Sequence, residues 1–128
     1  MSREGLVCAR QVRLASPFGA AMDTSKPADF KLPEDCQNMR EVRIGVDTTD
    51  RELMELFDRR FGYMRAAARI KTDRNVVRDE ARKTEVIENA RADAEKRDLP
   101  AGKIAQIWDD LVETSIAYEL GEWDRLRG

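Results

Sequence analysis

A long stretch without proline, from Asn38 to Lys71, most constrains how this chain can fold. Asn38 is followed three residues later by Glu41, and this pair has the chemistry of a capping box, which satisfies the first N–H groups of a helix. Side chains further along recur at alternating spacings of four and three, which places them on one side of a helix. These side chains are Leu53, Phe57, Arg60, Met64, Ala67 and Lys71. We therefore predict one long helix over 38–71.

Two shorter helices are expected after the long one. A polar break covers Thr72 to Asn75, and a second helix with a thin apolar face is predicted from Val77 to Arg97. A third helix is predicted from Pro100 to about Arg125, because proline is tolerated at a first helical position. Its apolar stripe holds Ile104, Trp108, Leu111, Val112, Ser115, Ile116, Glu119 and Trp123. The sequence contains no strand-like alternation, so the fold class is all-α.

The length of the first helix predicts how the chain assembles. Its 34 residues would span about 51 Å, whereas a compact domain of about 100 residues has a radius of gyration near 13 Å. Two shorter helices from the same chain would leave part of its apolar side bare. We therefore expect a three-helix protomer that pairs with a second copy in an intertwined homodimer.

Residues 1–32 follow neither a helical nor a strand period and contain scattered glycine, serine and proline. They are expected to form a mobile N-terminal extension that precedes a helical domain over 33–128. Arg3, Arg10 and Arg13 would also suit an organelle-targeting segment, and Met22 is an alternative start of the protein.

Composition excludes several classes of function. Because 23 lysines and arginines face 25 aspartates and glutamates, the chain lacks the cationic excess of a nucleic-acid binder. The absence of histidine excludes Ser-His and Cys-His catalysis and histidine-bearing metal sites. Two cysteines, Cys8 and Cys36, suit a reducing compartment, and no apolar run approaches the roughly 18 residues of a membrane span. We therefore expect a cytoplasmic protein that uses carboxylates, lysine, arginine or hydroxyls, with no metal and no membrane contact.

The long helix carries cations on its core-facing side. Arg60 and Lys71 are eleven residues apart, about three turns, so both project from the same line of the helix. Arg43 lies seventeen residues before Arg60, about 4.7 turns, and points well away from that line. Arg43 could therefore serve the same pocket only from the partner chain of an intertwined dimer.

Polar side chains in the two shorter helices have structural explanations when taken singly. Arg82, three residues after Asp79, would form a helical ion pair, and Ser115, one turn before Glu119, would bond its own backbone. Taken together, these residues are not accounted for by the structural explanations alone, because cations buried near a carboxyl cost several kcal/mol per ion unless anions compensate. A ligand with two carboxylates would compensate, since arginine binds a carboxylate through two parallel hydrogen bonds.

The pattern from about Pro33 to Trp123 resembles the all-helical type II chorismate mutases, especially the subgroup that contains the isochorismate-pyruvate lyase of salicylate biosynthesis. The resemblance is carried by Pro33-Glu34-Asp35-Cys36, Arg43, Asp47, Asp50, Arg59, Arg60, Tyr63, the run from Ala66 to Arg69, Lys71, Arg82, the Leu99-Pro100 turn and Glu119. It implies a cofactor-free enzyme that folds as an interlocked homodimer with two active sites. Its small-molecule substrate would be chorismate or isochorismate.

The resemblance also implies a role for each matching residue. Arg43 would reach the other protomer's pocket and hold substrate carboxylates together with Arg60. Lys71 would hydrogen-bond the ether oxygen and one carboxylate. The remaining positions implied at the pocket are Arg82 as part of the cationic wall, Asp79 beside the substrate hydroxyl, Ser115 at a carboxylate and Glu119 at the ether oxygen.

Two departures from the family pattern leave the reaction open. Glu119 occupies a position that is glutamine in well-known bacterial members, and a glutamate can donate to the ether oxygen only when it is protonated. Lys83 stands where some mutases place a glutamate toward the substrate hydroxyl. Ser115 favours a mutase that converts chorismate to prephenate, and Lys83 slightly favours the lyase. A non-catalytic helical dimerisation module is the third alternative.

Overall fold

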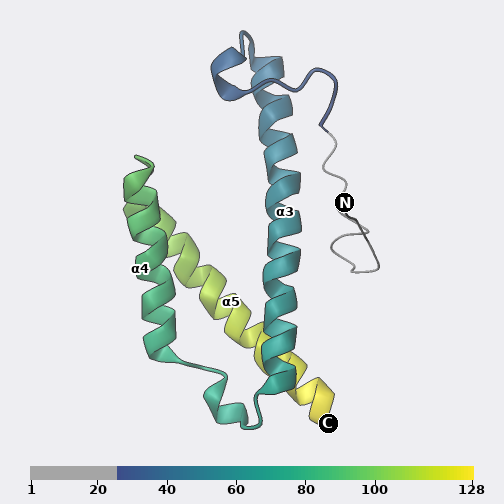
Figure 1. Ribbon diagram of the computed structural model, residues 1–128, viewed down its shortest axis with the longest axis vertical. Helices are drawn as coiled ribbons and strands as arrows, with labels where there is room; N and C mark the ends of the chain where they lie inside the picture. Colours follow the sequence, from purple (N-terminus) through teal and green to yellow (C-terminus); the bar gives the residue numbers. More distant parts are fainter. Residues whose placement is uncertain (1–25) are drawn as a thin grey trace, which may run out of the picture. The chain divides into compact units, whose positions relative to one another are not determined.

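The computed structural model describes residues 26–128 (Figure 1). Its helices are α3 (Met39–Ile70), α4 (Glu80–Lys96) and α5 (Ala101–Arg127), with short 3-10 turns η2 (Pro33–Asp35) and η3 (Arg74–Val76). Because no strand occurs within this described part, the predicted all-α architecture with three helices is confirmed for it. Residues 1–25 lie outside the described residues, and with them most of the predicted extension and Met22.

The chain divides into two compact units, Met1–Arg60 and Phe61–Gly128. The described part of the first unit holds the segment before α3 and the N-terminal part of that helix. The second unit holds the end of α3, the 3-10 turn η3 that follows it, and the helices α4 and α5.

The start of α3 is built from the predicted capping residues. The side-chain Oδ1 of Asn38 accepts the backbone N–H of Glu41 at 2.9 Å, so one of the orphan donors of the first turn is satisfied. The returning bond differs from the expected capping box, because Glu41 Oε1 accepts the N–H of Gln37 at 2.8 Å and not that of Asn38. The helix therefore begins one residue after the predicted start.

The segment that precedes α3 is fastened to the helix by ion pairs. Lys26 Nζ lies 2.8 Å from Glu52 Oε2, and Lys31 Nζ lies 2.8 Å from Glu41 Oε2. Arg40 pairs with Asp29 in the same unit. These contacts are largely exposed, so each contributes little stability by itself, but together they hold the segment along the first turns of α3.

Several large apolar side chains of this unit remain exposed. They are Val42, Val46, Leu53, Met54 and Leu56, which we call the exposed α3 surface, with Met54 65% accessible. A patch of this kind on a small chain marks an interaction surface more often than a solvated face.

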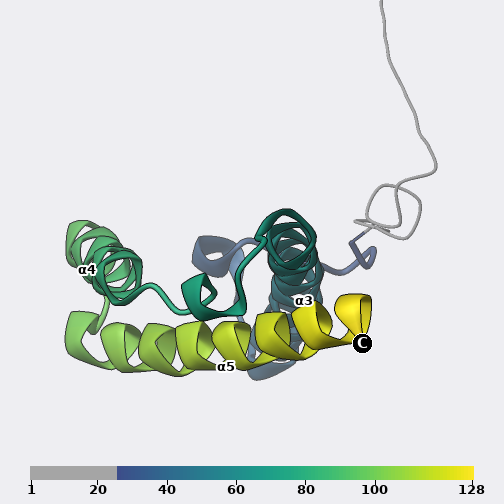
Figure 2. The same cartoon turned by 90° about the horizontal axis from the view of Figure 1, so that it is seen from below.

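In the second unit, α4 and α5 lie side by side as a helical hairpin (Figure 2), and their apolar side chains form a core. The buried centre consists of Val77, Val112 and Ile116. Further apolar side chains packed against it are Val86, Ile87, Leu120 and Trp123. This core positions the polar residues that lie on the same faces of α5.

The second helix begins later than the periodicity predicts, at Glu80 and not at Val77. Asp79 is the N-cap, and its Oδ1 accepts the backbone N–H of Arg82 at 3.0 Å. Val77 is buried at 4% exposure although it precedes the helix. The helical periodicity therefore placed Val77 in the second helix, although Val77 reaches the core from the turn before α4.

In the turn between α4 and α5, a residue in the left-handed conformation ends α4. Asp98 has a φ of 59°, and the N–H of Leu99 bonds back to the carbonyl of Ala94 at 2.9 Å. This arrangement satisfies a free carbonyl at the helix end in the usual manner of a left-handed cap. Pro100 is then the N-cap of α5, which begins at Ala101, one residue after the predicted start.

Candidate active site

Lys71 and Glu119 meet inside the second unit. Lys71 is the first residue after α3, and its Nζ lies 2.8 Å from Oε2 of Glu119. The same ammonium lies 3.4 Å from the carbonyl oxygen of Val77. Two residues that the sequence places 48 positions apart are thus brought together by the packing of α5 against the end of α3.

Glu119 is the more deeply buried member of this pair, and it places a carboxyl group in the apolar interior. The residue is only 4% exposed, whereas the side chain of Lys71 is 29% exposed. Among the described residues, Oε2 of Glu119 has no partner with hydrogen-bond geometry, and its contact with Lys71 is that of an ion pair. A buried carboxylate costs several kcal/mol unless it is compensated, and the Lys71 ammonium supplies this compensation.

Ser115 lies one turn before Glu119 on the same face of α5 and is 3% exposed. Its Oγ donates to the carbonyl oxygen of Leu111 at 2.7 Å. The structural explanation for Ser115 is therefore observed, since the hydroxyl bonds the backbone of its own helix.

Asp79 and Arg82 do not form the side-chain ion pair that their spacing suggested. Asp79 uses its carboxylate to cap α4, and the Nη1 of Arg82 lies 2.6 Å from Oε1 of Glu85. Both members of the Arg82 pair are more than 60% exposed, so this contact is readily exchanged for another anion.

Arg43 and Arg60 belong to the part of α3 in the first unit. Arg43 is exposed and Arg60 is half-buried. Their convergence with Lys71 around one substrate stays a prediction.

A charged cluster on α4 and α5 was missed by the sequence reasoning. Lys83 Nζ lies 2.6 Å from Glu113 Oε2 and 3.3 Å from Asp109 Oδ1. Arg78 forms two hydrogen bonds to the same Glu113 carboxylate, at 2.8 and 3.0 Å. The hydrogen bonds from Arg78 and then Lys83 lower the pKa of Glu113 to about 2. No local signal marks Glu113, because Arg78, before α4, and Lys83, in α4, are 35 and 30 residues away in the sequence.

This cluster predicts a pH-dependent effect on stability. A carboxyl whose folded pKa is about 2 and whose ordinary value is 4.5 stabilises the fold above the ordinary value, and this contribution is lost as pH falls toward 2. Glu113→Gln should therefore lower the melting temperature by a few degrees at pH 7, and the difference from wild type should vanish near pH 2. Thermal unfolding followed by circular dichroism across this range tests it, and an equal difference at all pH values would contradict it.

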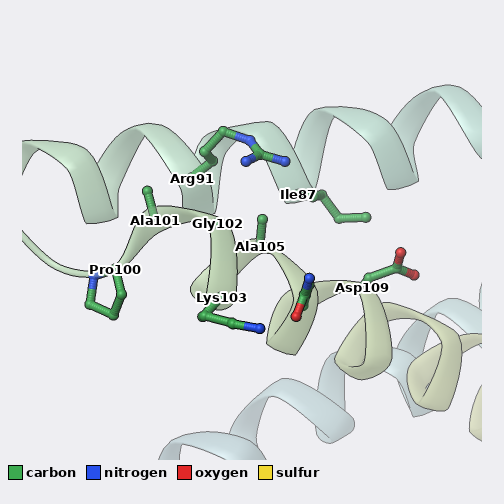
Figure 3. A pocket seen from close by; sticks show the side chains of 9 residues that line it. Ile87, Arg91, Pro100, Ala101, Gly102, Lys103, Ala105 and Asp109 are labelled. Atoms are coloured by element: carbon green, nitrogen blue, oxygen red, sulfur yellow. The ribbon is translucent and has the colours of Figure 1, made fainter.

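A groove of the second unit lies elsewhere, between α4 and the first turns of α5 (Figure 3). It encloses about 500 Å³. Ile87 and Arg91 come from α4, and Pro100, Lys103 and Ala105 line the opposite side (Figure 3). None of the residues predicted for the substrate site lines this groove, so it is a separate feature.

Among residues 26–128, no group of three or more acidic, cysteine or histidine side chains could hold a metal ion. No described helix combines the length and apolar character needed to cross a bilayer.

Comparison with known proteins identifies the family. Residues 42–120 match the family model described as chorismate mutase type II. The chain is 26% identical over 99 residues to the isochorismate pyruvate lyase of Pseudomonas aeruginosa, an alignment that covers 77% of this chain and 98% of that protein. No solved structure matches the chain significantly. The resemblance noted in the sequence is confirmed, and the chain belongs to the type II chorismate mutase family.

Proposed function

We propose that this protein is a chorismate mutase, which rearranges chorismate to prephenate without a cofactor. The observation that carries the proposal is the pair formed by Lys71 and the buried Glu119, 2.8 Å apart on different helices. Family membership supports an enzyme that acts on a small dicarboxylate of this kind. The domain responsible is assigned to residues 33–128.

The reaction suits a site with these residues. It is a pericyclic rearrangement that needs no nucleophile and no proton transfer, so a chain without histidine is not handicapped. A millionfold acceleration requires about 8 kcal/mol, and donors held in place where charge develops are an effective source. The Lys71 ammonium and a protonated Glu119 would both donate to the ether oxygen as its bond to carbon breaks.

The arginines would hold the two carboxylates of the substrate in the folded, reactive conformation. Arg60 would bind one of them, with Arg43 supplied by a second copy of the chain. Arg82 would exchange its exposed partner Glu85 for the substrate. Asp79 and Ser115 complete the proposed wall, at the substrate hydroxyl and at a carboxylate.

The site requires an intertwined homodimer in this proposal. The exposed α3 surface needs a partner, and a second copy of the chain would cover it. Pairing would also carry Arg43 to the partner's Lys71, in agreement with the helical phase of Arg43.

Mixing two inactive variants tests this arrangement. Arg43→Ala and Lys71→Ala homodimers should each be nearly inactive, because every site lacks one essential cation. After unfolding and refolding together, half of the dimers are mixed and each mixed dimer has one intact site, so about a quarter of the wild-type activity should return. Recovery at the level of either variant alone would show that both residues come from the same chain.

The lyase reaction, isochorismate to salicylate and pyruvate, is the second candidate. The similar protein of Pseudomonas aeruginosa carries that name. Lys83 also favours it, because the position that would offer a carboxylate to the substrate hydroxyl holds a lysine committed to Glu113 and Asp109.

Incubating the purified protein separately with chorismate and isochorismate distinguishes the alternatives. Prephenate formed from chorismate at the higher kcat/KM supports the mutase, and pyruvate released from isochorismate at the higher kcat/KM supports the lyase. Turnover of neither substrate, with no rise in melting temperature when either is added, would leave the non-catalytic module.

A further inference from the structure

The C-terminal end of α3 lies beside the C-terminal part of α5 (Figure 1), and side chains of α5 bond its last carbonyls. The last carbonyls of a helix have no intrahelical partner, and α3 ends at Ile70. Arg127 supplies donors for them: its Nη1 bonds the carbonyl oxygen of Ala68 at 3.0 Å, and its Nη2 bonds that of Arg69 at 3.4 Å. A cation at this end also complements the negative end of the helix dipole.

The same side chains hold the backbone of Lys71. Its carbonyl oxygen accepts two hydrogen bonds, from Arg127 Nη2 at 2.7 Å and from Trp123 Nε1 at 3.0 Å. The guanidinium of Arg127 stacks on the Trp123 indole, 4.3 Å from the ring centroid, a contact that favours a cation. Lys71 is therefore fixed at both its amide ends, because its own N–H bonds the carbonyl of Ala67 at 2.9 Å.

These contacts come from one stripe of α5. Glu119, Trp123 and Arg127 are spaced by four residues, so they lie above one another on one face of the helix. The first pairs with the Lys71 ammonium, and the other two hold the Lys71 carbonyl. One rigid element thus sets both the main chain and the side chain of this lysine.

We infer that Trp123 and Arg127 are positioning residues for Lys71. They hold its ammonium within hydrogen-bonding reach of the place that the substrate's ether oxygen would take. The inference rests on the proposed role of Lys71. Lys71 follows the helix directly, so without a cap its main chain would share the fraying of the last turn. A donor that acts on a transition state must be held within about 0.5 Å of its productive place, and a displacement of about 1 Å can cost a hundredfold in rate.

Four variants separate positioning from general stability. Arg127→Ala removes all three carbonyl contacts, Arg127→Lys keeps the charge without the planar fork, and Trp123→Phe keeps a ring for stacking but removes the indole N–H. Arg125→Ala is the matched control. Arg125 lies in the last turns of α5, two residues before Arg127, and it pairs with Glu122. For each variant, kcat and KM are measured on whichever of chorismate and isochorismate the wild type converts, together with the melting temperature and the amide exchange of residues 68–72.

We expect Arg127→Ala to lower kcat by about 10- to 100-fold and to speed amide exchange at Lys71, at an assay temperature where the variant remains folded. Arg127→Lys should recover part of the loss, Trp123→Phe should lose less than Arg127→Ala, and Arg125→Ala should match wild type in both measurements. Equal kcat for Arg127→Ala and Arg125→Ala would overturn the inference, as would exchange rates that do not change.

The exchange measurement keeps this inference distinct from the proposed function. If the wild type converts neither substrate, the proposed function fails. Faster exchange in Arg127→Ala but not in Arg125→Ala would then still support the hold on Lys71, and unchanged exchange would overturn it.

Discussion

Replacing Lys71 with alanine is expected to lower kcat for the proposed rearrangement by about 10²- to 10³-fold, the range observed when one donor to a developing oxyanion is removed. The Lys71 ammonium lies 2.8 Å from the buried Glu119 carboxyl. Its loss removes the donor and leaves Glu119 without a compensating charge. Steady-state kinetics with chorismate measure the effect, and circular dichroism verifies that the variant is folded at the assay temperature.

Lys96→Ala is the matched control for this experiment. Lys96 is exposed on the last turn of α4, so its loss removes the same charge without touching the proposed site. A loss of activity in Lys71→Ala that Lys96→Ala reproduces would point to net charge or stability as the cause. The non-catalytic module predicts a different pattern, in which Lys71→Ala and Arg60→Ala both leave dimer stability unchanged and no substrate stabilises the wild type.

Local signals in the sequence identify the elements of the fold more reliably than their ends. The cap at Asn38 is read correctly because a polar side chain and the amides it bonds lie within three residues. The start of α4 is misread because Val77 fits the helical period while Asp79, two residues later, stops the helix from extending backward. Periodicity reports which residues face the core, and a turn can direct a side chain into the core as a helix does.

The contacts of the candidate site are less accessible to sequence reasoning. Trp123 is expected in an apolar stripe, and its ring does pack against the core, but the partner of its indole N–H is 52 residues away. Arg127 lies beyond the predicted end of the third helix, so the sequence offers no reason to place it at Lys71. Hydrogen bonds between distant segments depend on how helices pack, which no local pattern specifies.

Lys71 and Glu119 could be predicted in part from the sequence, in their positions but not in their contact. Helical spacing places each of them in an apolar stripe, where either has a structural explanation. The family resemblance assigned both to one pocket, and the structure brings them to 2.8 Å from each other. Their roles toward a substrate stay a prediction, which the pH dependence of turnover tests most directly.

Turnover by the wild type is expected to fall as pH rises, and Glu119→Gln is expected to remove that dependence. A glutamate donates a hydrogen bond to the ether oxygen only while it is protonated, whereas a glutamine amide donates at every pH. The Lys71 ammonium from the end of α3 faces Glu119 at 2.8 Å. The ratio of variant to wild-type kcat should therefore rise as pH rises.

Glu122→Gln controls for the general effect of removing a carboxylate from this part of α5. Glu122 bonds Arg125, which lowers its pKa, so it stays ionised throughout the assay range and its replacement should leave the wild-type slope unchanged. If Glu119→Gln is instead slower at every pH and keeps the wild-type profile, Glu119 does not act as a donor. Its carboxylate would then serve to hold the Lys71 ammonium, and the transition state would receive its stabilisation from the cations alone.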